Sequence, residues 1–520
     1  MSPTTHQLEL PITGIHPPFE PTPIPRARRV FVNRNLKMDD IDWVGFDMDY
    51  TLAIYNQPEM DRLSIDATVT KLIARGYPEP ILRATEYPID FAVRGLLVDK
   101  RYGNVLKMDR FKVVHKGYHG LRELTREEIR SLYHQKKIRP ATSRYHWVDT
   151  LYALSEVTVY ASIIDRLDRL GEPVDYDKLF ADIRECIDEA HRDGTILDEV
   201  ASDLPRFIER DPALAQTLHK LRSAGKKLFL LTNSRWPYTE KMMTYLLGDA
   251  MPEYPSFRHY FDAVVVAASK PAFFQERRPL YVREVPPLKP APGAAAPPQV
   301  NGAPHPVPEL RLAVPPLERG NIYEGGNLQD FEKFLNTPGD RVLYVGDHIY
   351  GDILRSKKES VWRTVMIIQE MEAEVFAHES CREEHTMLSD YEERREQLED
   401  ELRYYQQSYK DIVRRLEEAK EKKSPAAPLE AERGRIKRAV ERIRGQMRVV
   451  DAELIRLERD ISRRFHPYWG SLLKEASETS SFGDQVEEYA CLYTSRVSNL
   501  NQYSPLQYFR SPRDLMPHEL

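Results

Sequence analysis

The stretch WVGFDMDYTLAIY (residues 43–55) decides the fold of this 520-residue chain. It opens with the uninterrupted apolar run 43–46, which is typical of a strand buried on both faces, and Asp47 breaks that run. Three more short apolar runs end in polar residues in the same way: 226–234 (KKLFLLTNS), 261–270 (FDAVVVAASK) and 341–352 (RVLYVGDHIYGD). Helix-like stretches separate them. This alternation predicts an α/β fold with a parallel sheet covered on both faces.

Polar residues begin where each predicted strand ends, and open α/β sheets bind their ligands at that edge. Asp47 and Asp49 follow the first strand, one residue apart. A carboxylate in this place can attack phosphorus and form an acyl phosphate. A second carboxylate two residues on can protonate the leaving alcohol and then deprotonate the attacking water. Because the attacked phosphate is itself an anion, such a site needs a divalent metal and a cationic side chain.

The other strand ends supply these parts. Thr232 and Asn233 offer a hydroxyl and amides to phosphate oxygens, and Lys270 offers a point charge. Asp347 and Asp352 offer carboxylates suited to oxygen-coordinated Mg²⁺. A single acidic pair is common in solvated turns. Four such elements, each at the end of a strand and in this order, predict a phosphoryl-transfer site.

The rest of the chain divides by composition. Between the first two strand runs lie about 170 residues with helical patterns at 147–167 and 177–191, too long for a crossover and long enough for an inserted cap. We therefore expect a catalytic core at 30–57 and 200–380 and a cap for substrate recognition at 58–199. The proline-rich residues 1–29 predict an extended arm.

Two further segments depart from the composition of the core. Residues 279–317 contain twelve prolines and predict a disordered surface insert. In residues 388–465 the apolar positions alternate spacings of four and three on either side of a breaker at 424–430, which predicts an antiparallel helical hairpin of coiled-coil type. Residues 466–520 return to a globular composition and are expected to pack on the core.

Composition excludes several classes of protein. The balance of 75 basic and 81 acidic residues gives a net charge of −6, so there is no global basic field for nucleic acid. The three cysteines lie far apart without a CxxC pair, which argues against a disulfide framework or a zinc ribbon. The first 30 residues lack a signal pattern and no apolar run approaches ~18 residues, so we expect a soluble, cytoplasmic protein with no membrane partner.

The order of DMDYTL (47–52), TNS (232–234), Lys270 and GDHIYGD (346–352) resembles the haloacid dehalogenase superfamily of aspartate-nucleophile phosphotransferases. More narrowly, the chain resembles the cytosolic purine 5′-nucleotidase family, the IMP- and GMP-preferring type. The segments that carry this narrower resemblance are 29–55, 94–109, 231–246, 344–364, 481–500 and 516–520. The resemblance implies a haloacid dehalogenase-like Rossmannoid sheet with an inserted cap.

The resemblance also implies a role for each residue at the strand ends. Asp47 would be the nucleophile that becomes phosphorylated, and Asp49 the general acid and base. Mg²⁺ would be held by Asp47, the backbone carbonyl of Asp49, and Asp347, while Asp352 would support the metal site. Thr232, Asn233 and Lys270 would hold the phosphate.

A base pocket is implied less directly. The family's HGFNF-like segment matches residues 115–119, where Tyr118 would stack on the base and His119 replaces an amide. Arg184 and Asp188, spaced i,i+4 on one helix face, would read the polar edge of a purine, with a structural salt bridge as the alternative. A lysine that the family places near Leu197 is absent, which leaves purine selectivity open.

The sequence therefore predicts a Mg²⁺-dependent 5′-nucleotidase that hydrolyses IMP and GMP through an aspartyl-phosphate and can also pass the phosphate to another nucleoside. The resemblance further implies nucleotide effectors and a homo-oligomer, a dimer or a tetramer. Two alternatives stay open. One is a phosphatase for another phosphomonoester, and the other is a scaffold protein that acts through the helical hairpin.

Overall fold

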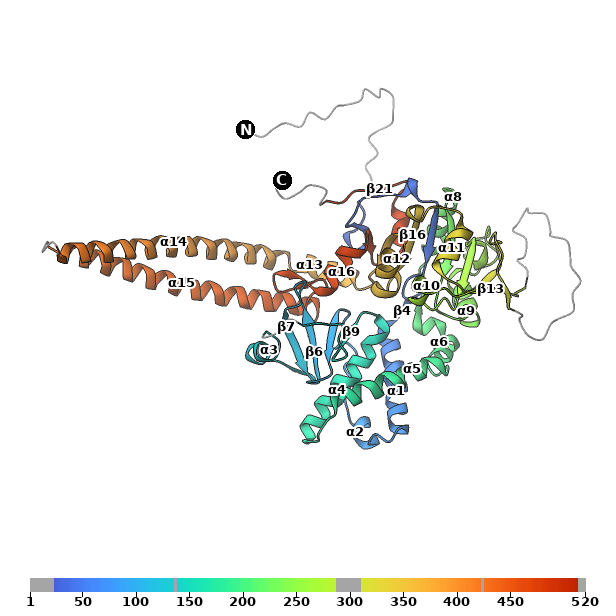
Figure 1. Cartoon of the computed structure of the whole chain (residues 1–520), viewed down its shortest axis with the longest axis horizontal. Helices are drawn as coiled ribbons and strands as arrows, with labels where there is room; N and C mark the ends of the chain where they lie inside the picture. The colour runs from blue at the N-terminus through green and yellow to red at the C-terminus, as the bar shows by residue number, and fades with distance from the viewer. Residues whose placement is uncertain (1–22, 135–137, 287–309, 422–424, 513–520) are drawn as a thin grey trace, which may run out of the picture.

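A ten-stranded sheet forms the centre of the molecule in a computed structural model that describes residues 23–134, 138–286, 310–421 and 425–512 (Figure 1). Parallel pairing runs through its middle, and antiparallel pairs occur at its two ends. The strand order is β1 (Phe31–Val32), β20 (Leu492–Thr494), β17 (Arg363–Ile367), β16 (Val342–Gly346), β3 (Trp43–Phe46), β11 (Lys227–Leu231), β12 (Ala263–Val266), β15 (Ile322–Gly325), β13 (Leu280–Arg283) and β14 (Leu310–Leu312). The predicted α/β class with a largely parallel sheet is confirmed.

Strand β3 lies between β16 and β11 and is buried along its whole length. Its glycine is required by packing, because a Cβ atom on Gly45 would lie 2.0 Å from the ring of Phe229, the residue paired with it on β11. This close contact brings the two strands that carry Asp47 and Thr232 together in a fixed register.

Helices connect the strands of the core. They are α8 (Leu214–Ser223), α9 (Trp236–Leu247), α10 (Ala272–Gln275), α11 (Leu328–Leu335), α12 (Arg355–Glu359) and α13 (Met371–Ser380). The four strands predicted from apolar runs are present as β3, β11, β12 and β16. The sequence analysis missed β15, β17 and β20. Strand β20 comes from the C-terminal segment and pairs with β17. This contact joins segments far apart in the chain, so the local sequence pattern does not predict it.

A smaller domain is inserted directly after the loop that carries Asp47 and Asp49. The chain leaves the core through β4 (Ile54–Tyr55) and returns through β10 (Ile208–Glu209), and these two strands pair with each other. Between them lies an antiparallel five-stranded sheet of β8 (Arg122–Glu123), β7 (Val114–His119), β6 (Asn104–Met108), β5 (Leu96–Asp99) and β9 (Tyr145–Val148). Its helices are α1 (Gln57–Ala74), α2 (Glu79–Arg83), α3 (Arg126–Tyr133), α4 (Leu154–Leu170), α5 (Tyr176–Arg192), α6 (Leu197–Ser202) and α7 (Leu204–Phe207). We call this domain the cap.

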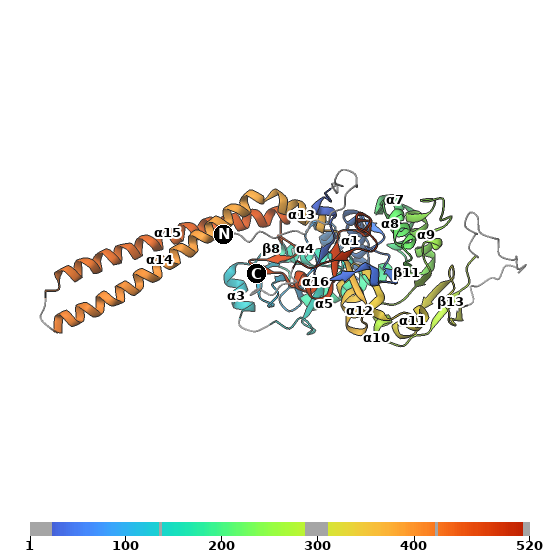
Figure 2. The same ribbon diagram turned by 90° about the horizontal axis from the view of Figure 1, so that it is seen from above.

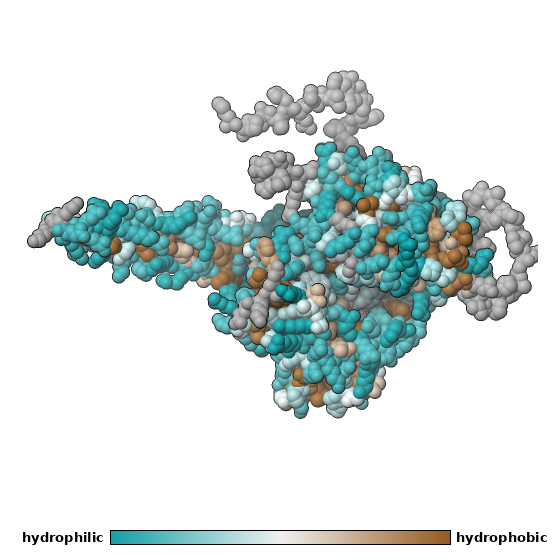
Figure 3. All heavy atoms as spheres, viewed as in Figure 1, coloured by the Kyte–Doolittle hydropathy of each residue, from teal (hydrophilic) through white to brown (hydrophobic). Residues whose placement is uncertain are grey.

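Helices α14 (Arg382–Glu421) and α15 (Ala427–Phe465) pack against each other as an antiparallel hairpin that extends away from the body of the molecule (Figures 1 and 2). Leu398, Ile412 and Ile443 are buried between the two arms. The outer surface of the hairpin is mainly hydrophilic (Figure 3). The hairpin predicted for residues 388–465 is therefore present, and its first arm starts six residues earlier than predicted.

After the hairpin the chain returns to the body and joins the cap to the core. The Lys107 ammonium, on cap strand β6, donates to the carbonyl oxygens of Trp469 at 2.9 Å and Ser471 at 2.6 Å and pairs with Glu475 at 2.8 Å. The Trp469 indole in turn donates to the carbonyl of Phe91 at 2.6 Å. From there α16 (Ser481–Tyr489) leads into β20 of the central sheet.

The structure corrects the insert predicted for 279–317 at both of its ends. Strands β13 and β14 lie inside that range and extend the sheet at one edge, where β13 pairs with both β15 and β14. Residues 287–309 of the insert and 1–22 of the proline-rich arm lie outside the described residues. Among the described helices, none combines the length and the apolar content that a membrane span requires.

Candidate active site

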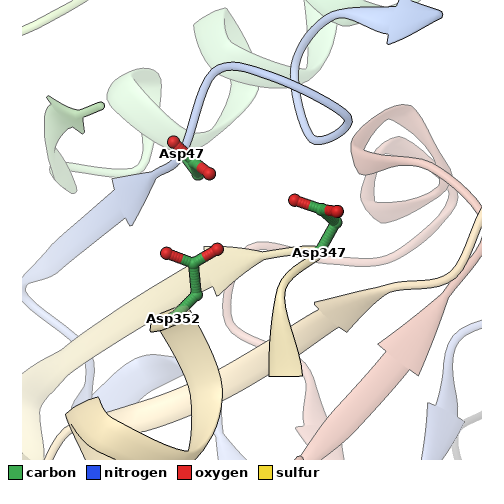
Figure 4. A group of neighbouring side chains, drawn as sticks. All are labelled: Asp47, Asp347 and Asp352. Carbon is green, nitrogen blue, oxygen red and sulfur yellow. The ribbon is translucent and has the colours of Figure 1, made fainter. Parts of the chain in front are cut away.

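The carboxyl ends of the central strands bring three aspartates together. Phe46 pairs with Val345 on β16 and with Leu230 on β11, so the residues that follow these strands lie side by side. Oxygen atoms of Asp47, Asp347 and Asp352 all lie within 4.8 Å of one another, and all three residues are buried (Figure 4). The predicted convergence of these strand ends is observed.

Lys270 enters this cluster from the end of β12. Its Nζ atom lies 2.8 Å from Asp47 Oδ1 and 2.6 Å from Asp352 Oδ1, and it donates to the Tyr344 hydroxyl at 2.9 Å. The Asn233 side chain fixes the lysine backbone, accepting from its N–H at 2.5 Å and donating to its carbonyl at 3.0 Å. The ammonium group of Lys270 thus lies against two of the three carboxylates of the cluster.

Burial and the neighbouring charges shift the pKa values of two aspartates in this cluster. Burial raises the pKa of Asp47 well above its usual range, although Lys270 acts in the opposite direction. Burial, and then the neighbouring Asp352, raise the pKa of Asp347 to about 7. Both shifts arise first from burial, so additional positive charge at the cluster would favour the ionised carboxylates.

The chemistry of the donor set fits a divalent cation. Carboxylate oxygens are the ligands that Mg²⁺ prefers, and three of them converge here from two adjacent strands. A bound cation would favour the ionised carboxylates and so reverse the pKa shifts described above.

The carboxylate of Asp49 has a different set of partners. Its Oδ2 accepts from the Ser234 hydroxyl at 2.6 Å, and its Oδ1 accepts from the Tyr55 hydroxyl at 2.6 Å. The Tyr55 hydroxyl lies 2.8 Å from that of Tyr238. Burial raises the pKa of Asp49, while the hydrogen bonds from Ser234 and Tyr55 lower it. Asp49 is therefore close to Asp47 in the sequence, but its carboxylate is held by hydroxyl groups that do not belong to the aspartate cluster.

Thr232 is fully buried at the end of β11, and its hydroxyl accepts from the N–H of Ser234 at 3.1 Å. Together with Asn233 it forms the turn that also positions Lys270. The phosphate-binding role of these residues stays a prediction.

The four residues predicted to bind the base lie in the cap, with other partners. Tyr118 is 5% exposed, and its ring packs against Phe91, Tyr468 and Trp469 at centroid distances of 5.6, 5.8 and 4.8 Å. His119 Nδ1 lies 2.8 Å from Asn104 Oδ1.

Arg184 Nη1 lies 2.9 Å from His146 Nδ1. The backbone carbonyl of Asp188 accepts from Arg192. In the part of the chain that the structure describes, no ion pair joins Arg184 to Asp188, and no hydrogen bond joins Tyr118, His119, Arg184 or Asp188 to the aspartate cluster. A base-binding role for these four residues stays a prediction.

Comparison with known proteins identifies the family. The model of the 5′ nucleotidase family matches residues 30–520. The chain belongs to the 5′-nucleotidase family.

Curated relatives carry the same family name. A 5′-nucleotidase domain-containing protein of Dictyostelium discoideum is 28% identical over 94% of this chain and 74% of its own length. The human 5′-nucleotidase domain-containing protein 2 is 30% identical over 70% of this chain and 67% of its own length, and the rat protein 31% over 66% and 60%. Among solved structures, CbbY from Rhodobacter sphaeroides in complex with phosphate is 15% identical over 63% of this chain and 86% of its own, with a TM-score of 0.23. As a member of the 5′-nucleotidase family, the protein is a phosphoric monoester hydrolase, and the resemblance predicted from the sequence is confirmed at this level.

In this nucleotidase, sequence reasoning missed a buried arginine that supports the site from outside. Arg94 is buried, donates to the backbone carbonyl of Asp347 at 2.9 Å and pairs with Glu370 at 2.5 Å. His348 Nε2 lies 3.2 Å from Asp149 of the cap. Arg94 and Tyr55 both lie in segments that carry the family resemblance, so the sequence marked these segments as important. The spacing of residues along the chain does not show which side chains Arg94 and Tyr55 contact in the fold.

Proposed function

We propose that this protein is a Mg²⁺-dependent 5′-nucleotidase that hydrolyses purine nucleoside 5′-monophosphates such as IMP and GMP through an aspartyl-phosphate on Asp47. The observation that carries the proposal is the buried cluster at the end of β3. It combines Asp47, a single ammonium group at 2.8 Å and two further aspartates within 4.8 Å. Family membership supports hydrolysis of nucleoside monophosphates.

In the first step a carboxylate oxygen of Asp47 attacks phosphorus, and the bond from phosphorus to O5′ breaks. Asp49 gives its proton to O5′, so the nucleoside leaves as a neutral alcohol. Lys270, with the amide and hydroxyl of Asn233 and Thr232, neutralises and orients the phosphate oxygens.

In the second step a water oxygen attacks the phosphorus of the aspartyl-phosphate, the bond to Asp47 breaks, and Asp49 takes the proton from the water. Asp47, Asp347 and the backbone carbonyl of Asp49 would hold Mg²⁺, with Asp352 in support. When bound, the ion supplies positive charge to the phosphate oxygens. A nucleoside hydroxyl in the place of the water would make the enzyme a phosphotransferase.

Selection of a purine is assigned to the cap, through Tyr118, His119, Arg184 and Asp188. We further propose that the enzyme works in the cytoplasm as a homo-oligomer, a dimer or a tetramer, and that nucleotides regulate it. These points are implied by the family resemblance of the sequence.

The test is phosphate release from IMP, GMP, AMP, CMP, UMP and several sugar phosphates, each with Mg²⁺ and with EDTA. Asp47→Asn removes the nucleophile, and Asp340→Asn, at an exposed position, is the matched control. Release that needs Mg²⁺, favours IMP or GMP and disappears only in Asp47→Asn is the expected result. Activity of Asp47→Asn within tenfold of the parent would overturn the mechanism.

A phosphatase for another phosphomonoester is the second candidate, because Tyr118 is enclosed by other aromatic rings and the family's lysine near Leu197 is missing. Metal-dependent release that favours a sugar phosphate would keep the aspartyl-phosphate and assign this second function. No release from any substrate, even with added purine nucleotides, would favour a scaffold that acts through α14 and α15.

A further inference from the structure

We propose that Tyr55, supported by Tyr238, is the positioning residue that holds Asp49 in place for both of its proton transfers. This inference rests on the proposed function, because only that mechanism uses Asp49 as acid and as base. Tyr55 itself touches neither the aspartate cluster nor Lys270 through any hydrogen bond among the described residues. Its effect on the reaction must therefore pass through Asp49.

The first support is the place of Tyr55 in the fold. It stands on β4, where the chain passes from the core into the cap, and its backbone pairs with Ile208 of β10. The side chain is 4% exposed, and its ring packs on Tyr50 and Tyr152 at centroid distances of 4.5 and 6.4 Å. A hydroxyl carried by a ring packed in this way has little freedom to leave Asp49.

The second support is the direction of the hydrogen bonds. A tyrosine hydroxyl carries one proton, so Tyr55, which donates to Asp49 Oδ1, must accept at its contact with Tyr238. Tyr238, on α9, then donates its own proton to Tyr55. The Ser234 hydroxyl occupies the other oxygen of Asp49 at 2.6 Å, so both carboxylate oxygens are held.

The same atoms also suit the protonated acid. If Oδ1 of Asp49 is protonated, its proton can rest against the Tyr55 oxygen while Tyr55 donates to Tyr238, and this proton turns from Tyr55 to O5′ when the nucleoside leaves. Only two hydroxyl hydrogens rotate, and no heavy atom moves. A group that acts first as acid and then as base thus keeps one position through both steps.

The test compares Tyr55→Phe, Tyr238→Phe and the double variant by kcat and KM for IMP with Mg²⁺. The control is Tyr160→Phe, which removes a buried hydroxyl that has no hydrogen-bond partner among the described residues. Loss of one hydrogen bond to a charged group is expected to lower the kcat of Tyr55→Phe by about 10- to 100-fold. KM should stay within about threefold. Tyr238→Phe should have a smaller effect, and the double variant should match Tyr55→Phe, because Tyr238 acts only through Tyr55.

A leaving group that needs no proton separates positioning from general damage. The p-nitrophenolate of p-nitrophenyl phosphate leaves unprotonated at pH 8, so Tyr55→Phe should release a rapid first equivalent of p-nitrophenol and then turn over slowly, since the second step still needs the base. A kcat of Tyr55→Phe within twofold of wild type would overturn the inference. An equal loss of kcat in Tyr160→Phe would also overturn it. The same holds if a lower Tm of Tyr55→Phe accounts for its loss of kcat. Absence of Asp47-dependent release in the wild type would instead refute the proposed function.

Discussion

Replacing Asp347 by asparagine is expected to abolish turnover and yet to stabilise the metal-free protein at alkaline pH. Asp347 is buried among two other carboxylates and one ammonium group, and burial with Asp352 raises its pKa from 3.8 to about 7. Each pKa unit corresponds to about 1.4 kcal/mol, so the ionised carboxylate costs the folded state at most about 4 kcal/mol. Asparagine keeps the shape and removes the charge. Because its amide is also buried, we expect a gain of about 1–4 kcal/mol.

The gain should depend on pH in a defined direction. Below about pH 4 the carboxyl group is protonated in the folded and the unfolded chain, so the substitution changes little. From about pH 4 to about 7 the unfolded chain releases this proton while the folded protein keeps it, and the stability of the wild type falls. Above about pH 7 the penalty is constant. The advantage of Asp347→Asn therefore grows across this window and then levels off.

Thermal unfolding in EDTA at pH 5 and at pH 8.5 measures this effect, with Asp340→Asn as the exposed control. At pH 8.5 the Tm of Asp347→Asn should exceed that of wild type by several degrees, since about 1 kcal/mol corresponds to about 2–4 °C in a domain of 150–250 residues. At pH 5 the difference should be less than half as large. Addition of Mg²⁺ should raise the Tm of the wild type and not that of the variant. An unchanged or lower Tm of the variant at pH 8.5 would refute the reasoning.

Three other substitutions test the fold and the cap. Gly45→Ala should destabilise the core by about 1–3 kcal/mol, measured as a lower Tm, because its new methyl group would overlap the ring of Phe229. Lys107→Met leaves the buried Glu475 without its cation and should cost about 3–5 kcal/mol, with earlier proteolytic cleavage at the base of the hairpin. Arg184→Ala should raise KM for IMP at least tenfold and leave hydrolysis of p-nitrophenyl phosphate unchanged, and equal effects on both substrates would remove Arg184 from the base pocket.

The convergence of the residues at the strand ends could be predicted from the sequence because the pattern that indicates it is local. Asp47, Lys270 and Asp347 each follow a short apolar run, and parallel strands bring their carboxyl ends to one edge of a sheet. The contacts of Asp49 were not predictable in this way. Tyr55 stands six positions after it in the same motif, but the role of its hydroxyl depends on Tyr238, which comes from a helix 183 positions further on.

The surroundings of the residues assigned to the base could not be predicted from local sequence patterns. Tyr118 was assigned to the base from its place in a short segment of β7, and the side chains that surround it come from the far end of the chain. Its hydroxyl donates to the carbonyl of Tyr468, 350 positions downstream, and Trp469 packs against its ring in an edge-to-face arrangement. The same C-terminal segment accepts the ammonium group of Lys107. The segment that follows the hairpin thus builds part of the cap, to which we assign the base, whereas the ends of the core strands hold the aspartate cluster. Changes at Trp469 should therefore alter which nucleotide is hydrolysed without altering the chemistry at Asp47.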